Sequence, residues 1–460
     1  MYQTIREKLK KSYEFVSLIG VLLFALLPLF MFIEPQDYGV IFKKFAHVEI
    51  VFLIGCLIAY LIYMVFSIYA CSPKEAFQKF KDKLFSYFSE QRHAVLFFIM
   101  IIIAVISAFL APDRTNAFSG NDHRPDGLLM YFCFAALFIF ASALRNPKYK
   151  YIVVVCYVLS FIAVSLVMIQ QFYGVIGTGP KAETPSFLIP LKELYSELGF
   201  RTGHFYKGMT GTFYNSNHMG YYIAVCSGVF TGIFIHTKKL AWSIVLLFLM
   251  AYSYWVLILN DTFGAYLAVL VAVSVYSVFC ALTKRAGVTK AMLPFVLFVC
   301  ISMSVSISGN PTGNTLLGKN FFQIGKDIKT ITQADDKTEV NGGSGRWKLW
   351  AGAVDMVAEK PLIGYGPDNF KKASSEHNMK MARSHNEFLE LSSAIGVPSA
   401  LFYYIGIISA LIYANIKKCK CAVTGGASVA VLAYFVSGLV GVFLFYTACH
   451  LFIMLGLMRE

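Results

Sequence analysis

The chain has 460 residues, of which 57% are hydrophobic and only 14% are charged. Soluble domains carry about 25% charged residues, so this composition excludes a soluble globular protein. It also excludes a disordered chain, because 16% of the residues are aromatic and disordered chains are poor in aromatic residues. The composition therefore predicts an all-α polytopic membrane protein.

Twelve apolar runs are candidates for transmembrane helices, each of which needs about 20 residues to cross a bilayer. They lie at 15–33, 49–70, 94–111, 128–144, 151–172, 218–235, 240–258, 265–282, 292–308, 396–414, 422–443 and 445–458. Only a weak break at Phe445 and Tyr446 separates the last two, so eleven spans are an alternative. We expect nine spans in 1–308, a large extracytoplasmic loop at 309–395, and three spans in 396–460.

A net charge of +14 would suit a nucleic-acid-binding protein, but the distribution of the charges argues against that function. With the N-terminus placed inside, the inside segments hold 21 Lys and Arg against 6 Asp and Glu. The outside segments hold 19 against 20. The positive excess lies entirely on the inside, as the positive-inside rule requires. We expect both termini in the cytoplasm, contacts with membrane lipids, and no nucleic-acid partner.

The predicted spans hold few groups that could carry chemistry. We find no Asp, Glu, Lys or Arg within their hydrocarbon depth, where only the pair Gln170-Gln171 and His450 stand out. Ion-coupled transporters usually place ionisable groups near the midplane of the membrane. This distribution disfavours a secondary transporter and places any chemistry at a membrane face.

Polar residues typical of helix N-caps precede four spans that would begin at the outer face. They lie in the stretches 121–127, 211–218, 260–262 and 383–387. Helix N-termini present backbone donors and positive dipole ends to anions. Asn215, Asn217 and Asp261 are therefore candidates for substrate binding, and plain capping at the membrane surface is the alternative.

The fourth stretch, Ser384-His385-Asn386-Glu387, has the Ser-x-x-Glu pattern of a capping box. This interpretation puts His385 at the first helical position, where the helix dipole disfavours the imidazolium form. A neutral histidine could accept a proton from a hydroxyl nucleophile. The alternative is an interfacial histidine without a role.

The segment 309–395 is polar but contains one amphipathic helix, predicted from Arg346 to Ala358. Its apolar residues recur with helical spacing; they are Trp347, Trp350, Val354 and Val357. Pro361 ends the helix, and Gly364-Tyr365-Gly366-Pro367 follows as a turn.

Two arginines flank these predicted elements, Arg346 before the amphipathic helix and Arg124 before the fourth span. A guanidinium group presents a fixed fork of donors that suits phosphate oxygens, although each could also be a solvated surface arginine. The outer segments contain no Asp-x-Asp pair and no cluster with metal-ligand spacing. We therefore expect neither a metal nor a cofactor.

Three stretches together resemble the O-antigen ligase and O-antigen polymerase superfamily of bacterial membrane glycan transferases. They are Gly211–Asn217, the stretch from Arg346 through Trp350 to Phe370, and His385–Leu389 followed by Ile395-Gly396. Arg124-Pro125-Asp126-Gly127 is similar to the Arg-x-x-Gly that precedes an early span in this family. The resemblance covers roughly residues 200–410.

The resemblance implies a GT-C-like glycosyltransferase with about twelve helices and a large helical loop outside the bacterial cytoplasmic membrane. Its donor would be a glycan on undecaprenyl pyrophosphate, and its acceptor a hydroxyl of a glycan, a lipid or the cell wall. His385 and Asn386 match the family's histidine motif, which implies that His385 is the base. The resemblance also assigns the pyrophosphate to Arg346 and Arg124.

The chain departs from the family pattern at the eighth span. Members often carry an arginine there in a Ser-Arg-Gly-Ala pattern, whereas this chain has Phe263 at that position. Either Arg201, Lys207 or Arg124 replaces that arginine on the pyrophosphate, or the chain belongs to a subgroup with different donor contacts.

The expected function is transfer of a glycan to an acceptor hydroxyl at the outer face, as in O-antigen ligases. Polymerisation of lipid-linked repeat units for O-antigen, capsular polysaccharide or exopolysaccharide is one alternative. A transporter or flippase of lipid-linked glycan is an alternative of another class. A flippase would move its substrate across the membrane without forming a glycosidic bond.

Overall fold

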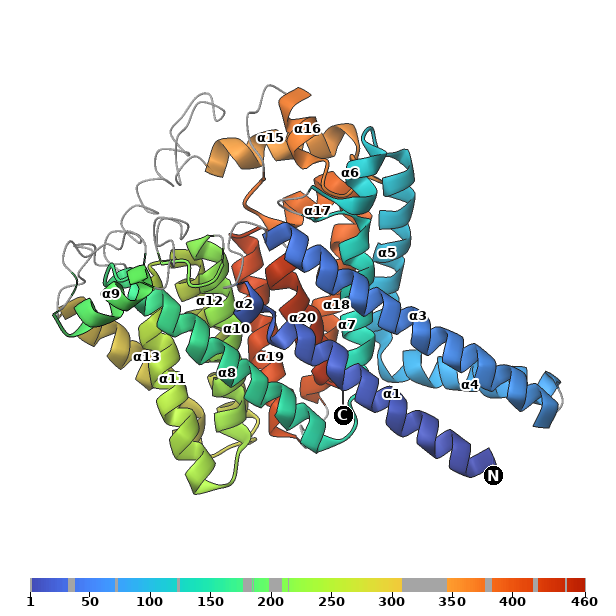
Figure 1. The fold of residues 1–460 in the computed structure, drawn as a ribbon, viewed down its shortest axis with the longest axis horizontal. Helices are drawn as coiled ribbons and strands as arrows, with labels where there is room; N and C mark the ends of the chain where they lie inside the picture. Colours follow the sequence, from blue (N-terminus) through green and yellow to red (C-terminus); the bar gives the residue numbers. More distant parts are fainter. Residues whose placement is uncertain are drawn as a thin grey trace.

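The computed structural model shows an assembly of helices (Figure 1). It describes residues 2–31, 38–70, 73–121, 125–176, 184, 186–197, 209–213, 215–307, 346–376, 383–416, 421–442 and 445–459. Within these ranges the regular structure is helical and includes no strand. The prediction of an all-α polytopic membrane protein is confirmed.

The helices follow one another along the chain with mostly short connections. They are α1 (Tyr2–Ala25), α2 (Leu27–Phe30), α3 (Tyr38–Ala70), α4 (Pro73–Glu90), α5 (Arg92–Leu110), α6 (Arg114–Ser119), α7 (Leu128–Ala143), α8 (Pro147–Phe172), η1 (Ser186–Leu188), α9 (Ile189–Glu197), α10 (Ser216–His236), α11 (Leu240–Asn260), α12 (Phe263–Leu282), α13 (Val288–Ile307), α15 (Arg346–Glu359), α16 (Phe370–Glu376), α17 (Glu387–Ile395), α18 (Val397–Ile416), α19 (Ala422–Leu439) and α20 (Phe445–Leu457).

Nine helices of the described chain are long and apolar enough to cross a membrane. The segments concerned are in α3, α5, α8, α10, α11, α12, α13, α18 and α19. The other three predicted runs fall on α1 with α2, on α7 and on α20, and α7 and α20 are shorter apolar helices. α19 ends at Leu439 and α20 begins at Phe445, so the last two predicted runs are separate helices. The break between them lies earlier in the chain than the predicted break at Phe445 and Tyr446. A count of twelve spans stays a prediction.

The prediction that the spans hold no acidic residue is wrong at Glu49. The second span runs from Gly39 to Tyr63, so Glu49 lies inside it and not at its start. Its side chain is fully buried, and neither carboxyl oxygen has a hydrogen-bond partner. An isolated ionised carboxylate in such surroundings is strongly unfavourable, so the neutral acid is favoured there.

Four helices, α6, α15, α16 and α17, gather at one end of the assembly, which we call the loop end (Figure 1). The N-terminal end of α1 and the C-terminal end of α20 lie on the opposite side of this view. The positions of the two termini relative to the membrane, and the compartment that they face, stay predictions.

The centre of the assembly depends on close contact between α10 and α19, which pack along each other. Gly228 and Gly232 on α10 are four residues apart, the small-xxx-small spacing that lets membrane helices approach closely. A Cβ atom added at Gly228 would lie 2.6 Å from the backbone of Ala430. One added at Gly232 would meet the carbonyl oxygen of Gly425. The two backbones therefore touch where glycine leaves space.

Basic side chains satisfy helix C-termini at the end opposite the loop end. Lys150 donates to the carbonyls of Leu457 and Arg459, and Lys290 donates to the carbonyl of Thr237. Cations near helix C-termini are favourable because they complement the dipole and the free carbonyls. The basic junctions that the sequence places inside therefore also stabilise the helix ends.

We predict that Gly232→Ala lowers the stability of the detergent-solubilised protein, because the new methyl group would force α10 away from α19. Overpacking of this kind costs about 1–3 kcal/mol. Gly55→Ala on α3 is the matched control, since nothing lies within 4 Å of a Cβ atom added there. Thermal unfolding should show a lower midpoint for Gly232→Ala alone, and equal midpoints for the two variants would contradict this packing.

Candidate functional site

The amphipathic helix is present as α15, from Arg346 to Glu359, but its buried face differs from the predicted stripe. Leu349, Ala353 and Met356 are buried, and the last two pack with Tyr365 and Phe370 of the following segment. Of the predicted stripe, Val354 is 52% exposed and the other three residues are half-buried. Contact with Tyr365 and Phe370 determines which face of α15 is buried, and the sequence pattern of the helix does not show this contact.

The turn after α15 is held by backbone pairing with the end of α17. The N–H groups of Tyr365 and Gly366 donate to the carbonyls of Ser393 and Ala394, both over 2.8 Å. Gly364 and Gly366 have φ angles of 64° and 100°, in the left-handed region that favours glycine. A Cβ atom at Gly364 would lie 2.5 Å from the backbone of α17. The two glycines of this motif therefore allow the turn to lie directly against α17.

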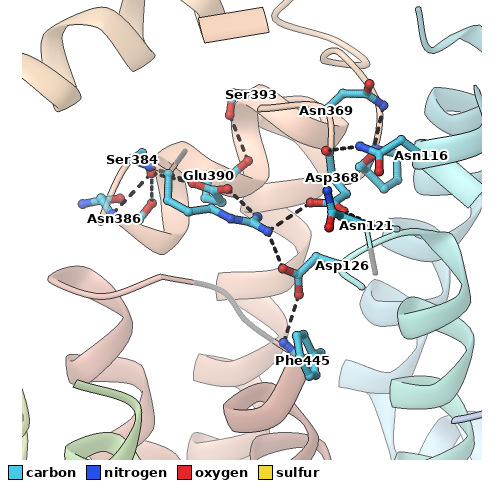
Figure 2. Close-up of polar contacts among 12 residues, drawn as sticks. Asn116, Asn121, Asp126, Asp368, Asn369, Ser384, Asn386, Glu390, Ser393 and Phe445 are labelled. Atoms are coloured by element: carbon cyan, nitrogen blue, oxygen red, sulfur yellow. Dashed lines mark hydrogen bonds and ion pairs between the residues drawn. The ribbon is translucent and has the colours of Figure 1, made fainter. Parts of the chain in front are cut away.

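A buried ionic cluster lies where the loop end meets the helices. Arg383, which is 9% exposed, binds three carboxylates. Its Nη2 atom lies 2.5 Å from an oxygen of Asp126 and 3.0 Å from one of Asp368. Its Nη1 atom lies 2.8 Å from an oxygen of Glu390. Figure 2 shows Asp126, Asp368 and Glu390 converging from three separate segments. We call these four residues the Arg383 cluster.

Each carboxylate of the Arg383 cluster also fixes backbone. Asp126 accepts from the N–H of Phe445 at the start of α20 over 3.0 Å (Figure 2). Asp368 accepts from the N–H of Asn121 over 2.7 Å. Glu390 accepts from both the N–H and the hydroxyl of Ser384, over 2.9 and 3.0 Å. The cluster thereby joins α17, the turn after α15, the segment before α7, and α20.

The charges of the Arg383 cluster do not balance, since one guanidinium faces three carboxyl groups. Burial raises the pKa of Asp126, Arg383 opposes this shift, and Asp368 and Glu390 add to it. Burial alone would lower the pKa of Arg383, but the carboxylates raise it overall. Arg383 occupies the place between the carboxylates that a bound cation would need. Removing it would leave buried carboxyl groups unpaired, which is strongly destabilising.

His385 lies between Arg383 and Glu390 in the chain, and its backbone is in the left-handed region with a φ of 55°. Few residues other than glycine adopt this conformation, and such strain persists only where the surroundings impose it. Ser384, bound to Glu390, precedes His385, and Asn386 follows it as the cap of α17. His385 is therefore held between two anchored neighbours.

The predicted capping box at 384–387 is wrong. Asn386, not Ser384, is the N-cap of α17, and its Oδ1 atom accepts from the N–H of Leu389 over 3.0 Å. The Ser384 hydroxyl is bound to Glu390 instead. His385 therefore lies outside the helix, and the predicted effect of the dipole at the first helical position does not apply. In addition, Gly396 separates α17 from α18, so the helix that begins here is not the tenth span.

Glu387, the expected partner in the capping box, points into the helices. Its fully buried carboxyl group accepts hydrogen bonds from the hydroxyls of Tyr403, Tyr404 and Tyr434, over 3.1, 3.3 and 2.9 Å. Burial raises the pKa of Glu387 from 4.5 to about 7, although the three hydroxyls oppose the shift. Glu387 thus anchors α17 to α18 and α19.

Two predicted site residues meet at the C-terminal end of α19. Asn386 donates from Nδ2 to the carbonyl of Leu439 over 3.0 Å. Arg346 donates from Nη1 to the carbonyl of Val440 over 3.4 Å. The structure therefore brings the arginine motif and the histidine motif to adjacent residues, although 39 positions separate Arg346 from His385 in the sequence.

Tyr221 on α10 joins this group, because its hydroxyl donates to the same Val440 carbonyl over 3.5 Å. Because Arg346 binds the same carbonyl, the two side chains lie close together. Val440 also lies against α12, since a Cβ atom at Gly264 would be 2.9 Å from its side chain. The end of α19 is thus a meeting point for α10, α12, α15 and α17.

The remaining predicted residues in the described chain lie at the starts of α10 and α12. Asn215 is the N-cap of α10, and its side chain accepts from the N–H of Asn217 over 2.8 Å. Asp261 has a φ of 58° and ends α11, so it does not cap α12 as expected. Thr262 precedes α12 but makes no side-chain cap; its hydroxyl donates to the carbonyl of Ser216.

Two of the four expected helix caps are therefore present and two are not. α10 and α17 have asparagine caps, whereas α12 lacks a side-chain cap and α7 begins after Gly127 without one. Arg124, Arg201 and Lys207 lie outside the described residues, so their predicted roles stay predictions. Phe263 is the first residue of α12 and precedes Gly264, which lies against Val440. What takes the place of the family arginine there stays a prediction.

Sequence reasoning missed the Arg383 cluster, although its signals were present. Asp126 and Asp368 lie inside two of the motifs that carry the family resemblance, and Arg383 lies two residues before His385. Acidic residues are scarce in this chain, at 26 of 460. Two acidic residues inside separate motifs, and an arginine beside a third motif, indicate an ion pair between segments that are distant in the sequence.

Comparison with known protein families gives one match. Residues 245–404 match the family described as O-Antigen ligase. This match covers about a third of the chain and includes Arg346, His385 and Asn386. It confirms the resemblance to the O-antigen ligase superfamily. No curated protein matches the chain.

The raised pKa of Glu387 predicts how the stability of the protein depends on pH. Its pKa is raised on folding from 4.5 to about 7, so the folded state binds more protons than the unfolded state between these values. Stability should therefore fall as pH rises from about 4.5 to 7 and then level off. In Glu387→Gln this part of the decline should disappear, as measured by thermal unfolding across that range. Glu359→Gln, at the exposed end of α15, is the control, and an unchanged slope in Glu387→Gln would contradict the assignment.

Proposed function

With the O-antigen ligase superfamily as the premise, we propose that this protein transfers a glycan from undecaprenyl pyrophosphate to an acceptor hydroxyl. The family supports glycan transfer of the ligase or polymerase type in general. The reaction would take place at the loop end, on the outer face of the bacterial cytoplasmic membrane. It needs no metal in this proposal, because arginine and helix N-termini neutralise the pyrophosphate.

One observation carries the proposal: Arg346 and Asn386, the neighbour of His385, bind adjacent carbonyls at the end of α19. A guanidinium that binds phosphate and a residue that accepts a proton must act on the same donor–acceptor pair. Proximity of this kind provides much of the rate enhancement in bimolecular reactions. The contacts of Arg346 and Asn386 with adjacent carbonyls support such proximity, although these residues lie far apart in the sequence.

In the proposed reaction the acceptor hydroxyl oxygen attacks the anomeric carbon of the donor sugar. The hydroxyl proton passes to His385 as the new glycosidic bond forms. The bond between the anomeric carbon and the pyrophosphate oxygen breaks, and undecaprenyl pyrophosphate leaves with its charge. Arg346 stabilises that charge together with the N-terminus of α10, and Arg124, Arg201 or Lys207 would be further donors.

Different structural observations support the roles proposed for the other site residues. Asn386 caps α17 and binds Leu439, so it would position His385. Asn215 and Asn217 lie at the start of α10, where the positive end of the helix dipole would face the pyrophosphate. Asp261 is half-buried beside them, and burial raises its pKa.

We predict that His385→Ala and His385→Asn both abolish transfer while the protein stays folded and inserted. Asparagine tolerates the left-handed backbone better than alanine does, so His385→Asn keeps the loop geometry and removes only the base. General-base catalysis typically contributes about 10²–10⁴-fold. Product formation by purified protein is the measurement. Full activity in His385→Asn would remove His385 from the mechanism.

Ligase and polymerase differ in the acceptor and therefore in what accumulates without the protein. Deletion of the gene in its host should leave long glycan chains on the polyprenyl carrier if the protein is a ligase. Single repeat units on the carrier would instead identify a polymerase. Gel electrophoresis of the extracted lipid-linked glycans separates the two results, and complementation with His385→Asn should fail to restore the wild-type pattern. Restoration by that variant would contradict the proposed chemistry.

A further inference from the structure

Helix α4 lies between two candidate membrane spans and packs against both. Two residues separate it from α3, and one separates it from α5. Figure 1 shows α4 running sideways along the last part of α3 to the lower end of α5. The ring centroid of Phe80 lies 6.1 Å from that of Tyr60, inside the span of α3. The ring centroid of Phe88 lies 5.8 Å from that of Phe98, inside the span of α5. These contacts hold α4 at the depth where the two spans leave the membrane.

The C-terminal end of α4 is fixed to the end of the helices opposite the loop end. The Glu90 carboxyl group lies 2.9 Å from Nη2 of Arg145, just after α7, and 2.6 Å from Nη2 of Arg459, just after α20. The Tyr87 hydroxyl lies 3.2 Å from that of Ser142. The Arg383 cluster contacts the other ends of α7 and α20. These contacts determine which face of α4 points outward.

The outward face of α4 combines exposed phenylalanines with lysines. Phe77 is 64% exposed and Phe85 is 74% exposed, and Lys74 and Lys81 are exposed as well. These four residues follow the spacing i, i+3, i+7 and i+11, which places them within about 80° of one another around the helix. We call them the Phe-Lys face. None of them is among the aromatic residues that pack α4 against α3 and α5.

Other polar residues of α4 lie on different sides of the helix. Glu75 and Asp82 each follow a lysine of the Phe-Lys face by one position, about 100° further round. Asp82 accepts from the side chain of Gln78 over 2.9 Å. Ser86 is exposed and lies on the side opposite Phe77. The helix therefore has an apolar and basic side and a polar side, as helices that lie in a membrane interface do.

We propose that α4 is an interfacial helix whose Phe-Lys face binds anionic phospholipids in the leaflet opposite the loop end. Helices of this kind bury their apolar face at the boundary between headgroups and acyl chains, so Phe77 and Phe85 enter that boundary. The aliphatic stems of Lys74 and Lys81 follow the same face and carry their ammonium groups to the lipid phosphates. Negatively charged headgroups complement these two charges.

A protein partner, or a second copy of this chain, is the other means of covering an exposed apolar face. The packing of Phe80 and Phe88 against the spans favours lipid, because it keeps α4 at the membrane surface along its length. A soluble protein would approach the polar side that carries Ser86. The inference concerns the end of the protein remote from the candidate site, and it does not depend on the proposed glycan transfer.

Photochemical cross-linking tests which molecules cover the Phe-Lys face. The full chain carries p-benzoyl-phenylalanine in place of Phe85 and is reconstituted in vesicles of equal parts phosphatidylglycerol and phosphatidylethanolamine. We expect cross-linked phospholipid at this position, detected by mass spectrometry. The same amino acid in place of Ser86, which is also exposed, is the matched control and should give much less lipid. Equal lipid at the two positions, or a second protein molecule cross-linked at position 85 in place of lipid, would overturn the proposal.

The preference between the two lipids tests the lysines. A lysine at an anionic surface favours binding about fivefold, so cross-linked phosphatidylglycerol should exceed phosphatidylethanolamine at least about fivefold at position 85. Lys74→Gln with Lys81→Gln should bring this ratio toward one. Lys371→Gln with Lys372→Gln, two exposed lysines of α16 at the loop end, is the matched control and should keep the original ratio. An unchanged ratio in the variant of Lys74 and Lys81 would overturn the proposal.

Discussion

The arrangement of the candidate site depends on one buried arginine. Arg383 holds carboxyl groups from the segment before α7, from the turn after α15 and from α17. These segments are far apart in the sequence, and backbone hydrogen bonds join the turn to α17. A buried charge is strongly unfavourable without a partner, so Arg383 and its carboxylates must be buried together. His385 and Asn386 follow directly in the chain, and the cluster therefore fixes where they lie.

The transmembrane helices supply the other half of the arrangement. Close packing of α10 on α19 through Gly228 and Gly232 sets the position of the α19 end. Arg346, Asn386 and Tyr221 all bind carbonyls at that end. Close helix packing thus positions the polar groups at the α19 end, while the buried ion pairs of Arg383 lie at the loop end.

Much of this structure could be predicted from sequence. All twelve apolar runs fall on helices, the amphipathic helix at Arg346 begins where expected, and the resemblance to the O-antigen ligase superfamily is confirmed. The failures occur where tertiary contacts choose between local options. Ser384 has the sequence pattern of a cap but binds Glu390, Glu387 points to three tyrosines, and α15 buries a face other than the predicted stripe. A local sequence pattern does not show which distant residue a side chain contacts, so it cannot predict these three contacts.

The central claim is that the loop end forms a glycosidic bond and does not merely move lipid-linked glycan. The most direct measurement uses purified protein in vesicles that contain radiolabelled lipid-linked glycan and host acceptor extract. Mass spectrometry follows new covalent products, and protection from an added glycosidase follows movement of the label across the bilayer. The account predicts a new glycan–acceptor or glycan–glycan product whether or not label moves. Movement of the label without any new bond would contradict the account and identify a flippase.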